Sequence, residues 1–238
     1  MRYSKTILAI AFSTILTGVS CIKKEPLAQI SQVLMVPLSP DASAVDFVIN
    51  DQVQATTVNY SSTVGTAIYS FPYYTITPGN TKVTYNLSGT TTAYATVTGP
   101  IDPETAYSTF LIDSVKRAKL VMTKDDVSEP PEGKVKLRFL HFSPNAPAMD
   151  VSKSGGAVLF TNRSFNDQES NTAFQKFIVV DPGSYQFVFK TSGTTTTLVT
   201  TSTINLLPDR IYTLAARGVF GVTGTNKALS AWWYANRP

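Results

Sequence analysis

The residue types most often used in catalysis and metal binding are scarce in this sequence. One cysteine, Cys21, and one histidine, His141, occur among 238 residues. These numbers exclude a disulfide framework and a zinc site built from cysteine and histidine. Ser143 lies close to His141, but no G-x-S-x-G motif surrounds it, and glycine-rich phosphate loops are also missing. We therefore expect His141 to be a packed strand residue, and we predict no enzymatic activity, no metal and no cofactor.

Two aspartates, Asp46 and Asp150, each follow a proline-containing loop and lie at the start of an apolar run. At such positions a carboxylate commonly accepts hydrogen bonds from backbone N–H groups and fixes the loop against the following strand. A calcium site is the alternative, with Asp41 or Asn145 as a second oxygen ligand. Calcium takes about six to eight oxygen ligands, more than this pattern offers. We interpret Asp46 and Asp150 as structural loop residues.

Aromatic residues are the strongest indication of binding. Trp232, Trp233 and Tyr234 are consecutive near the C-terminus, and Tyr73 and Tyr74 form a second group. On a strand, Trp232 and Tyr234 point to one face and Trp233 to the other. Packing in a core or between domains is one interpretation. The other is a stacking platform for a sugar ring or a protein partner, and all five residues are candidates for it.

The N-terminal segment resembles a bacterial lipoprotein signal peptide. Arg2 and Lys5 precede an apolar run at residues 6–16, which is too short to span a bilayer. Small residues then precede Cys21, where we expect lipid attachment; cleavage at the same place without lipidation is the alternative. An acylated Cys21 would anchor the protein to a membrane. The charged residues 23–25 resemble the surface-export signals of Bacteroidetes lipoproteins, so we expect an outer-membrane protein of the cell envelope, which faces either the cell surface or the periplasm.

Composition favours β structure and argues against nucleic-acid binding. Only 15% of the residues are charged, and the sequence contains 32 threonines together with many valines, tyrosines and phenylalanines. The formal net charge is +4, and two of the cations, Arg2 and Lys5, lie in the signal segment. No run of lysine and arginine alternates with aromatic residues, so no nucleic-acid partner is expected.

The sequence contains an internal repeat. Residues 39–46 recur at 143–150, and residues 76–79 recur at 180–183, both at an offset of 104. Pro103, Glu104 and Tyr107 match Pro208, Asp209 and Tyr212 at an offset of 105. Several blocks in the same order at nearly one offset indicate two copies of one domain.

The predicted organisation is therefore all-β, with two tandem immunoglobulin-like antiparallel β-sandwich domains. We expect a signal peptide at 1–20, the lipidated cysteine and a tether at 21–30, domain 1 at 31–124, a stiff proline-containing linker at 125–133, and domain 2 at 134–238. In the second copy we expect strands at 135–142, 157–161, 174–180, 185–191, 196–203, 211–217 and 229–234.

Three stretches of the second copy carry a family resemblance. They are residues 137–151 (LRFLHFSPNAPAMDV), 182–185 (PGSY) and 211–216 (IYTLAA). They resemble the family of domain of unknown function 4397, which occurs in secreted and lipid-anchored bacterial proteins. The first copy keeps Ser39, Pro40, Asp41, Ala42 and Asp46 but departs from the second at 36–38. The resemblance implies a β-sandwich and an envelope location, and it implies no activity.

The function best supported by the sequence is a non-catalytic, lipid-anchored envelope protein whose two domains bind a glycan or a protein partner. The membrane is reached through the lipid at Cys21. Duplication suits binding, because two modest sites on one tether reinforce each other. A purely structural spacer, held extended by the proline-containing linker, is the alternative. A hydrolase is a third and weaker hypothesis.

Overall fold

The computed structural model shows an all-β protein. It describes residues 29–60 and 72–237. The predicted signal peptide, Cys21 and most of the tether therefore lie outside the described residues. Within them, the strands form four four-stranded sheets and one two-stranded sheet. The all-β prediction is confirmed.

Two sheets belong to the first half of the chain. One has the order β4-β1-β7-β8 and consists of β1 (Ser31–Pro37), β4 (Tyr73–Ile76), β7 (Ala106–Ile112) and β8 (Lys119–Asp125). The other has the order β3-β2-β5-β6 and consists of β2 (Val45–Ile49), β3 (Gln52–Val58), β5 (Gly79–Leu87) and β6 (Ala93–Ile101). All pairings are antiparallel except that of β1 with β7.

The second half repeats this arrangement. One sheet has the order β12-β9-β17-β18 and consists of β9 (Val135–His141), β12 (Ile178–Val180), β17 (Ile211–Arg217) and β18 (Ser230–Arg237). The other has the order β11-β10-β14-β15 and consists of β10 (Met149–Lys153), β11 (Val158–Arg163), β14 (Phe187–Thr191) and β15 (Thr197–Thr200). A small sheet pairs β13 (Gly183–Tyr185) with β16 (Ile204–Leu206). The parallel pair β9–β17 corresponds to β1–β7.

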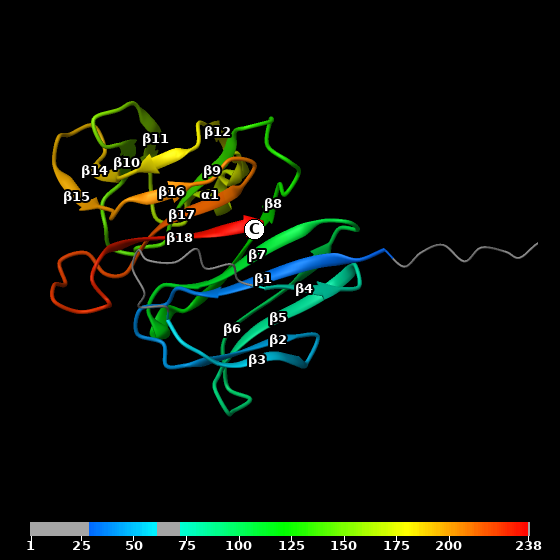
Figure 1. Cartoon of the computed structure of the whole chain (residues 1–238). Helices are drawn as coiled ribbons and strands as arrows, with labels where there is room; N and C mark the ends of the chain where they lie inside the picture. Colours follow the sequence, from blue (N-terminus) through cyan, green and yellow to red (C-terminus); the bar gives the residue numbers. More distant parts are fainter. Residues whose placement is uncertain (1–28, 61–71, 238) are drawn as a thin grey trace, which may run out of the picture.

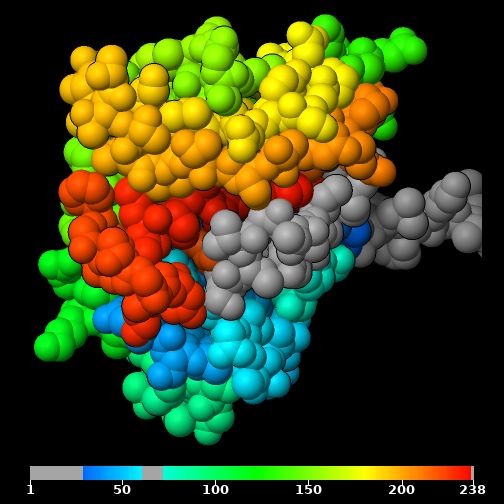
Figure 2. Space-filling view, turned by 60° about the vertical axis from the view of Figure 1, so that its left-hand side comes forward, coloured from blue at the N-terminus to red at the C-terminus, as the bar shows by residue number. Residues whose placement is uncertain are grey.

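The sheets stack in four layers (Figure 1). A hydrophobic core lies between the two sheets of the first half, with Phe47 and Tyr85 at its centre, and a second core around Phe139 and Phe189 lies between the sheets of the second half. A third core joins the halves: Leu34, Val36, Leu38, Phe110, Ile112 and Val121 of the first half pack on Leu140, Phe142, Ala215, Trp232 and Tyr234 of the second. Figure 2 shows the C-terminal segment running along the seam between the halves.

This face-to-face packing explains why β7, β9 and β17 are buried at all seven positions. A strand covered on both faces needs apolar or compensated residues throughout, rather than the alternation of a half-exposed strand. It also corrects the predicted linker. Asp125 is the last residue of β8 and is buried, so the connection between the halves begins after it. The connection does not hold the halves apart.

Three short helices complete the fold: η1 (Val115–Arg117), α1 (Asp167–Ser170) and η2 (Thr172–Gln175). The strand expected at 174–180 is too long, because Phe174 and Gln175 belong to η2. The Asn171 side chain accepts a hydrogen bond from the Ala173 N–H and so caps this turn. The strand β10 was not among the predicted strands. The strand predicted at 211–217 matches β17.

Candidate functional site

The C-terminal aromatic residues do not form an exposed platform. Trp232 is 2% exposed and Tyr234 is fully buried, and both pack in the core between the halves with ring centroids 5.0 Å apart. As candidates for ligand stacking these two residues are excluded, because the first half of the chain covers the face of β18 on which they lie. Trp233 points to the opposite face and packs against the core of the second half, with its ring 6.0 Å from that of Tyr212.

Trp233 nevertheless lines a small groove. It is half-buried, and the groove has a volume of about 220 Å³. Its other lining residues include Thr200, Thr201 and Leu229. Tyr74 is half-buried beside the core of the first half, whereas the Tyr73 hydroxyl donates a hydrogen bond to Asp125 Oδ2 at 2.6 Å. Burial, followed by the negative charge of Asp125, raises the pKa of Tyr73. The five aromatic candidates thus occupy different environments and do not form one site.

Asp46 and Asp150 fix equivalent loops. Asp46 accepts hydrogen bonds from the backbone N–H groups of Thr57 and Gly89, at 2.9 and 2.8 Å. Asp150 accepts them from Asn162 and Gly193, also at 2.8 and 2.9 Å. In both cases the backbone donors favour the ionised carboxylate and lower its pKa. These bonds join neighbouring strands of each outer sheet.

His141 shows no catalytic arrangement. It is fully buried, and its Nε2 lies 3.2 Å from the carbonyl oxygen of Pro147. Burial lowers the pKa of His141. No hydrogen bond connects it to Ser143 or to a carboxylate among residues 29–60 and 72–237. In the same part of the chain no three histidine, cysteine, aspartate or glutamate residues gather as a metal site would require.

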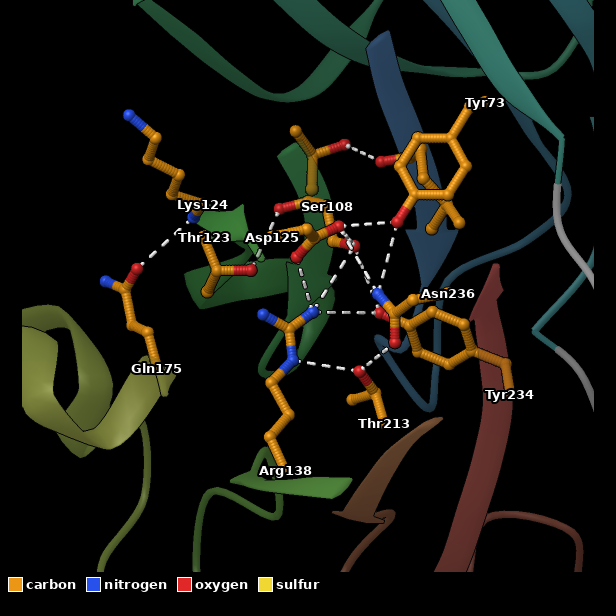
Figure 3. A network of polar contacts seen from close by, with 12 residues as sticks. Tyr73, Ser108, Thr123, Lys124, Asp125, Arg138, Gln175, Thr213, Tyr234 and Asn236 are labelled. Carbon is orange, nitrogen blue, oxygen red and sulfur yellow. Dashed lines mark hydrogen bonds and ion pairs between the residues drawn. The ribbon is translucent and has the colours of Figure 1, made fainter. Parts of the chain in front are cut away.

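A buried polar cluster holds the two halves together (Figure 3). Arg138 of β9 is fully buried and forms an ion pair with Asp125 of β8, with 2.7 Å between Nη2 and Oδ1. Arg138 Nε donates to Thr213 at 2.8 Å, and Nη2 lies 3.4 Å from the Ser108 hydroxyl and 3.3 Å from the Tyr234 hydroxyl. Its guanidinium also lies 4.6 Å from the centroid of the Phe177 ring.

Asp125 is the acceptor at the centre of this cluster. Its Oδ2 accepts hydrogen bonds from Ser108 and Tyr73 at 2.6 Å each, and from the Asn236 amide at 3.3 Å. Burial opposes the charge on Arg138, but the Asp125 carboxylate together with Tyr234 and Tyr73 outweighs it, so the pKa of Arg138 is raised. Sequence reasoning missed this pair because Asp125 lies in a run of charged residues that resembles a solvated linker.

A hollow lies next to this cluster, at the seam. Its volume is about 620 Å³, and its surface is mostly apolar. The first half and the connecting segment contribute residues 104–106 and 124–128, and the second half contributes Thr172, Gln175, Lys176 and Phe177. We call this hollow the seam groove.

Most polar groups of the seam groove already have partners. Lys124 Nζ is paired with Asp102, Asp126 with Lys136, and the Gln175 amide oxygen accepts a bond from the Lys124 backbone. The side chains of Glu104 and Lys176 make no hydrogen bond or ion pair with other described residues. The groove therefore presents an aromatic ring, one free carboxylate and one free ammonium group.

A second hollow of about 580 Å³ lies between the connecting segment and the loop before β17. It is lined mostly by polar surface from Glu129, Pro130, Glu132, Pro208, Asp209, Arg210 and Ile211. Because it is more polar and has no aromatic side chain, it resembles a ligand site less closely than the seam groove does.

Comparisons with known proteins identify a family. The model of the family described as Domain of unknown function (DUF4397) matches residues 31–152, which are 122 of the 238 residues. The match includes the first repeat and the stretch at 137–151 of the second. No curated protein matches the chain.

Solved structures give only weak likenesses. One solved structure, described under the words “Alpha-glucan recognition by family 41 carbohydrate-binding modules from streptococcal virulence factors”, is 10% identical with a TM-score of 0.27. The match covers 87% of this chain and 97% of that one. A second, on α-glucan binding by a streptococcal virulence factor, has 9% identity and a TM-score of 0.25, with coverage of 79% and 93%. A leucine-rich repeat protein from Bacteroides thetaiotaomicron has 13% identity and a TM-score of 0.18, with coverage of 85% and 27%. At TM-scores this low, neither a common fold nor a common ligand follows.

Proposed function

The chain belongs to the DUF4397 family, and from that premise we propose that it is a non-catalytic, lipid-anchored protein of the cell envelope that binds a glycan in the seam groove. The observation that carries this proposal is the seam groove itself. It combines a mostly apolar surface, the Phe177 ring and two free charged groups of opposite sign, Glu104 and Lys176. Apolar clefts with a few convergent polar groups are the usual form of small-molecule sites.

The size of the groove favours a glycan over a protein partner. About 620 Å³ lies within the range of pockets for small ligands, roughly 300–1,000 Å³. A stable protein partner requires roughly 1,200 Å² or more of buried surface, more than a local hollow supplies. An aromatic ring can stack on the apolar face of a sugar, and Glu104 and Lys176 can accept from and donate to its hydroxyl groups.

The rest of the proposal concerns fold and location. The equal strand order of the two halves supports the interpretation as tandem immunoglobulin-like sandwiches. The sequence at Cys21 supports lipid attachment and an outer-membrane location, with the described domains outside the lipid. Among the described residues, no helix is long and apolar enough to cross a membrane. Face-to-face packing of the halves argues against the extended spacer.

The test is a glycan array followed by calorimetric titration of the best ligand against the purified full-length chain. Replacing Phe177 with alanine, or Lys176 with glutamine, should weaken binding at least tenfold, because the ring and the free donor are removed. Phe220→Ala is the matched control, since Phe220 is an exposed aromatic residue outside the groove. Binding that is unchanged by both groove variants, or that is lost with Trp233→Ala instead, would contradict the proposed site. Absence of any glycan ligand for folded protein would contradict the proposed function.

A further inference from the structure

A second buried arginine lies on the same interface, and it has no partner of opposite charge among the residues that the structure describes. Arg217 is the last residue of β17, and its side chain is fully buried. None of its three guanidinium nitrogens forms a hydrogen bond with any of residues 29–60 or 72–237. Burial lowers the pKa of Arg217, and the only electrostatic opposition comes from Tyr60.

The groups around Arg217 are two aromatic rings and two hydroxyls. The Tyr60 ring lies 4.5 Å from the guanidinium carbon, and the Trp232 ring lies 5.8 Å from it. Ser230 is directly opposite Arg217 on β18, so both side chains point to the same face of the sheet. The buried hydroxyls of Ser230 and Tyr60 also have no hydrogen-bond partner in the described part of the chain.

This arrangement is costly unless something else supplies the missing acceptors. An arginine carries five N–H donors, and each buried donor left without an acceptor costs about 1–3 kcal/mol. Cation–π contacts offset part of the cost of the charge, about 2 kcal/mol in a desolvated site, but they do not satisfy N–H donors directed along the guanidinium edges. Loss of a proton does not remove this buried charge, since the pKa of arginine stays above the physiological range.

Among the described residues, no carboxylate lies at Arg217. Most described acidic residues have backbone or basic partners elsewhere, and the few that have none, such as Glu104, line the groove or the connecting segment. Residues 61–71 contain no acidic residue, and Glu25 is the only one in residues 1–28.

We propose that Arg217, with the hydroxyls of Ser230 and Tyr60, is a binding site for a carboxylate group from outside the chain. A planar carboxylate can accept two parallel N–H bonds from one guanidinium edge and further bonds from the two hydroxyls. A single buried positive charge is neutralised by a monoanion, whereas a phosphate or sulfate dianion would leave a buried net negative charge.

A ligand for Arg217 would approach from the loop that follows β17. Arg217 lies where β17 ends, and the following loop, residues 219–230, is exposed or half-buried along its whole length. The site is separate from the seam groove, since none of its residues lines that groove. Failure of the glycan proposal therefore leaves this inference standing, and the reverse also holds.

The experiment measures thermal unfolding of the full-length chain with increasing sodium acetate, compared with sodium chloride of equal ionic strength. We expect acetate to raise the melting temperature of the wild type by about 2–4 °C more than chloride, in a saturable manner. Sulfate and phosphate, tested in the same way, should give a smaller shift. Equal or larger shifts with these dianions would overturn the assignment to a carboxylate.

Three variants test the role of the residue. Arg217→Met should abolish the acetate-specific shift, and Arg117→Met, at an exposed arginine, should retain it. Arg217→Lys keeps the buried charge but loses the planar fork, so it should show a clearly smaller shift, and it serves as the test if the methionine variant fails to fold. A wild type without an acetate-specific shift, or an Arg217 variant with an undiminished shift, would overturn the proposal.

Discussion

Arg138 and Arg217 are two fully buried arginines on the same sheet face, and they differ in almost every other respect. Arg138 is opposite Thr213 on β17. Arg217 is four residues further along β17, so its backbone lies about 13 Å from that of Thr213. Arg138 has a carboxylate partner and hydrogen bonds with three hydroxyls, whereas Arg217 contacts aromatic rings and makes no hydrogen bond with described residues. The charge of the first is paired within the fold, although its Nη1 has no hydrogen-bond partner there, and the second has no partner of opposite charge among the described residues.

The repeat sharpens this contrast. At the offsets that relate the two copies, Arg138 corresponds to Leu34 and Arg217 to Ile112. Both aliphatic residues are in the core between the halves, where an apolar side chain needs no partner. The two halves therefore share their strand order but differ at the surfaces that meet. We infer that the arginines are features specific to the second half, one for assembly and one for a ligand.

Breaking the satisfied pair should produce the largest effect. Asp125→Ala leaves Arg138 buried without its counter-charge, and we expect a loss of about 3–5 kcal/mol in the free energy of unfolding. Urea unfolding at neutral pH measures this loss. The double variant with Arg138→Met should recover most of it, because no unpaired charge then remains. A loss below about 1 kcal/mol for Asp125→Ala would show that the pair does not hold the halves together.

The loop beside Arg217 should respond next most strongly. Gly218 has φ of +84°, and a Cβ there would lie 2.2 Å from the carbonyl oxygen of Ala228. Gly218→Ala should therefore destabilise the protein by about 2–3 kcal/mol and weaken the response to acetate. Gly155→Ala is the matched control, with φ of +68° and no atom within 4 Å of the added Cβ. Equal effects of the two substitutions would show that the close approach at Gly218 has no energetic role.

The two loop aspartates should behave alike, in contrast to the arginines. Asp46→Asn and Asp150→Asn each replace one of the two carboxylate oxygens that accept backbone N–H bonds with an NH2 donor, and each should cost about 1–2 kcal/mol. Urea unfolding of the two single variants checks this. A large difference between them would contradict the equivalence of the loops.

The same aspartates predict a pH dependence. Their pKa values in the folded protein are below the ordinary value of 3.8, so their contribution to the free energy of unfolding is fully present above that pH. It is lost as the pH falls through the folded-state values, because the unfolded chain binds protons first. Stability should fall below about pH 4, and less steeply in the double asparagine variant. An unchanged slope in that variant would assign the acid sensitivity to other groups.

The smallest loss of stability is expected at Arg217 without its ligand. In chloride buffer, Arg217→Met should lower the free energy of unfolding by less than about 1 kcal/mol or raise it, because an apolar side chain replaces an unpaired buried charge with unsatisfied donors. Differential scanning calorimetry in acetate-free buffer measures this change. A loss comparable to that of Asp125→Ala would mean that Arg217 has an internal partner.

The sequence predicted the strands better than their assembly. The internal repeat corresponds to the equal strand orders of the two halves. The strand predicted at 211–217 corresponds to β17. Packing between domains was one interpretation of the C-terminal aromatic residues, and the burial of Trp232 and Tyr234 between the halves agrees with it. That whole sheets pack face to face was not predicted, although continuous apolar runs such as 135–142 carry the signal, since a strand buried on both faces does not alternate. Asp125 was mistaken for a linker residue because its ion pair depends on a tertiary neighbour.

The site shows the same limit. The burial of Trp232 and Tyr234 depends on which half covers them, and the sequence contains no trace of that. The seam groove draws residues from segments some fifty positions apart, such as Lys124 and Gln175, which only the folded chain brings together. Arg217 had no distinguishing sequence feature, because a strand arginine commonly extends its charged group to solvent.

The most direct test of the contrast between the two arginines is NMR of their side-chain Nε–H groups in the full-length chain. We predict that acetate shifts the Arg217 signal progressively and slows its exchange with water, while the Arg138 signal stays unchanged and protected throughout. An Arg217 signal that acetate does not move, or an Arg138 signal that moves equally, would contradict the account that the fold satisfies one arginine and a ligand the other.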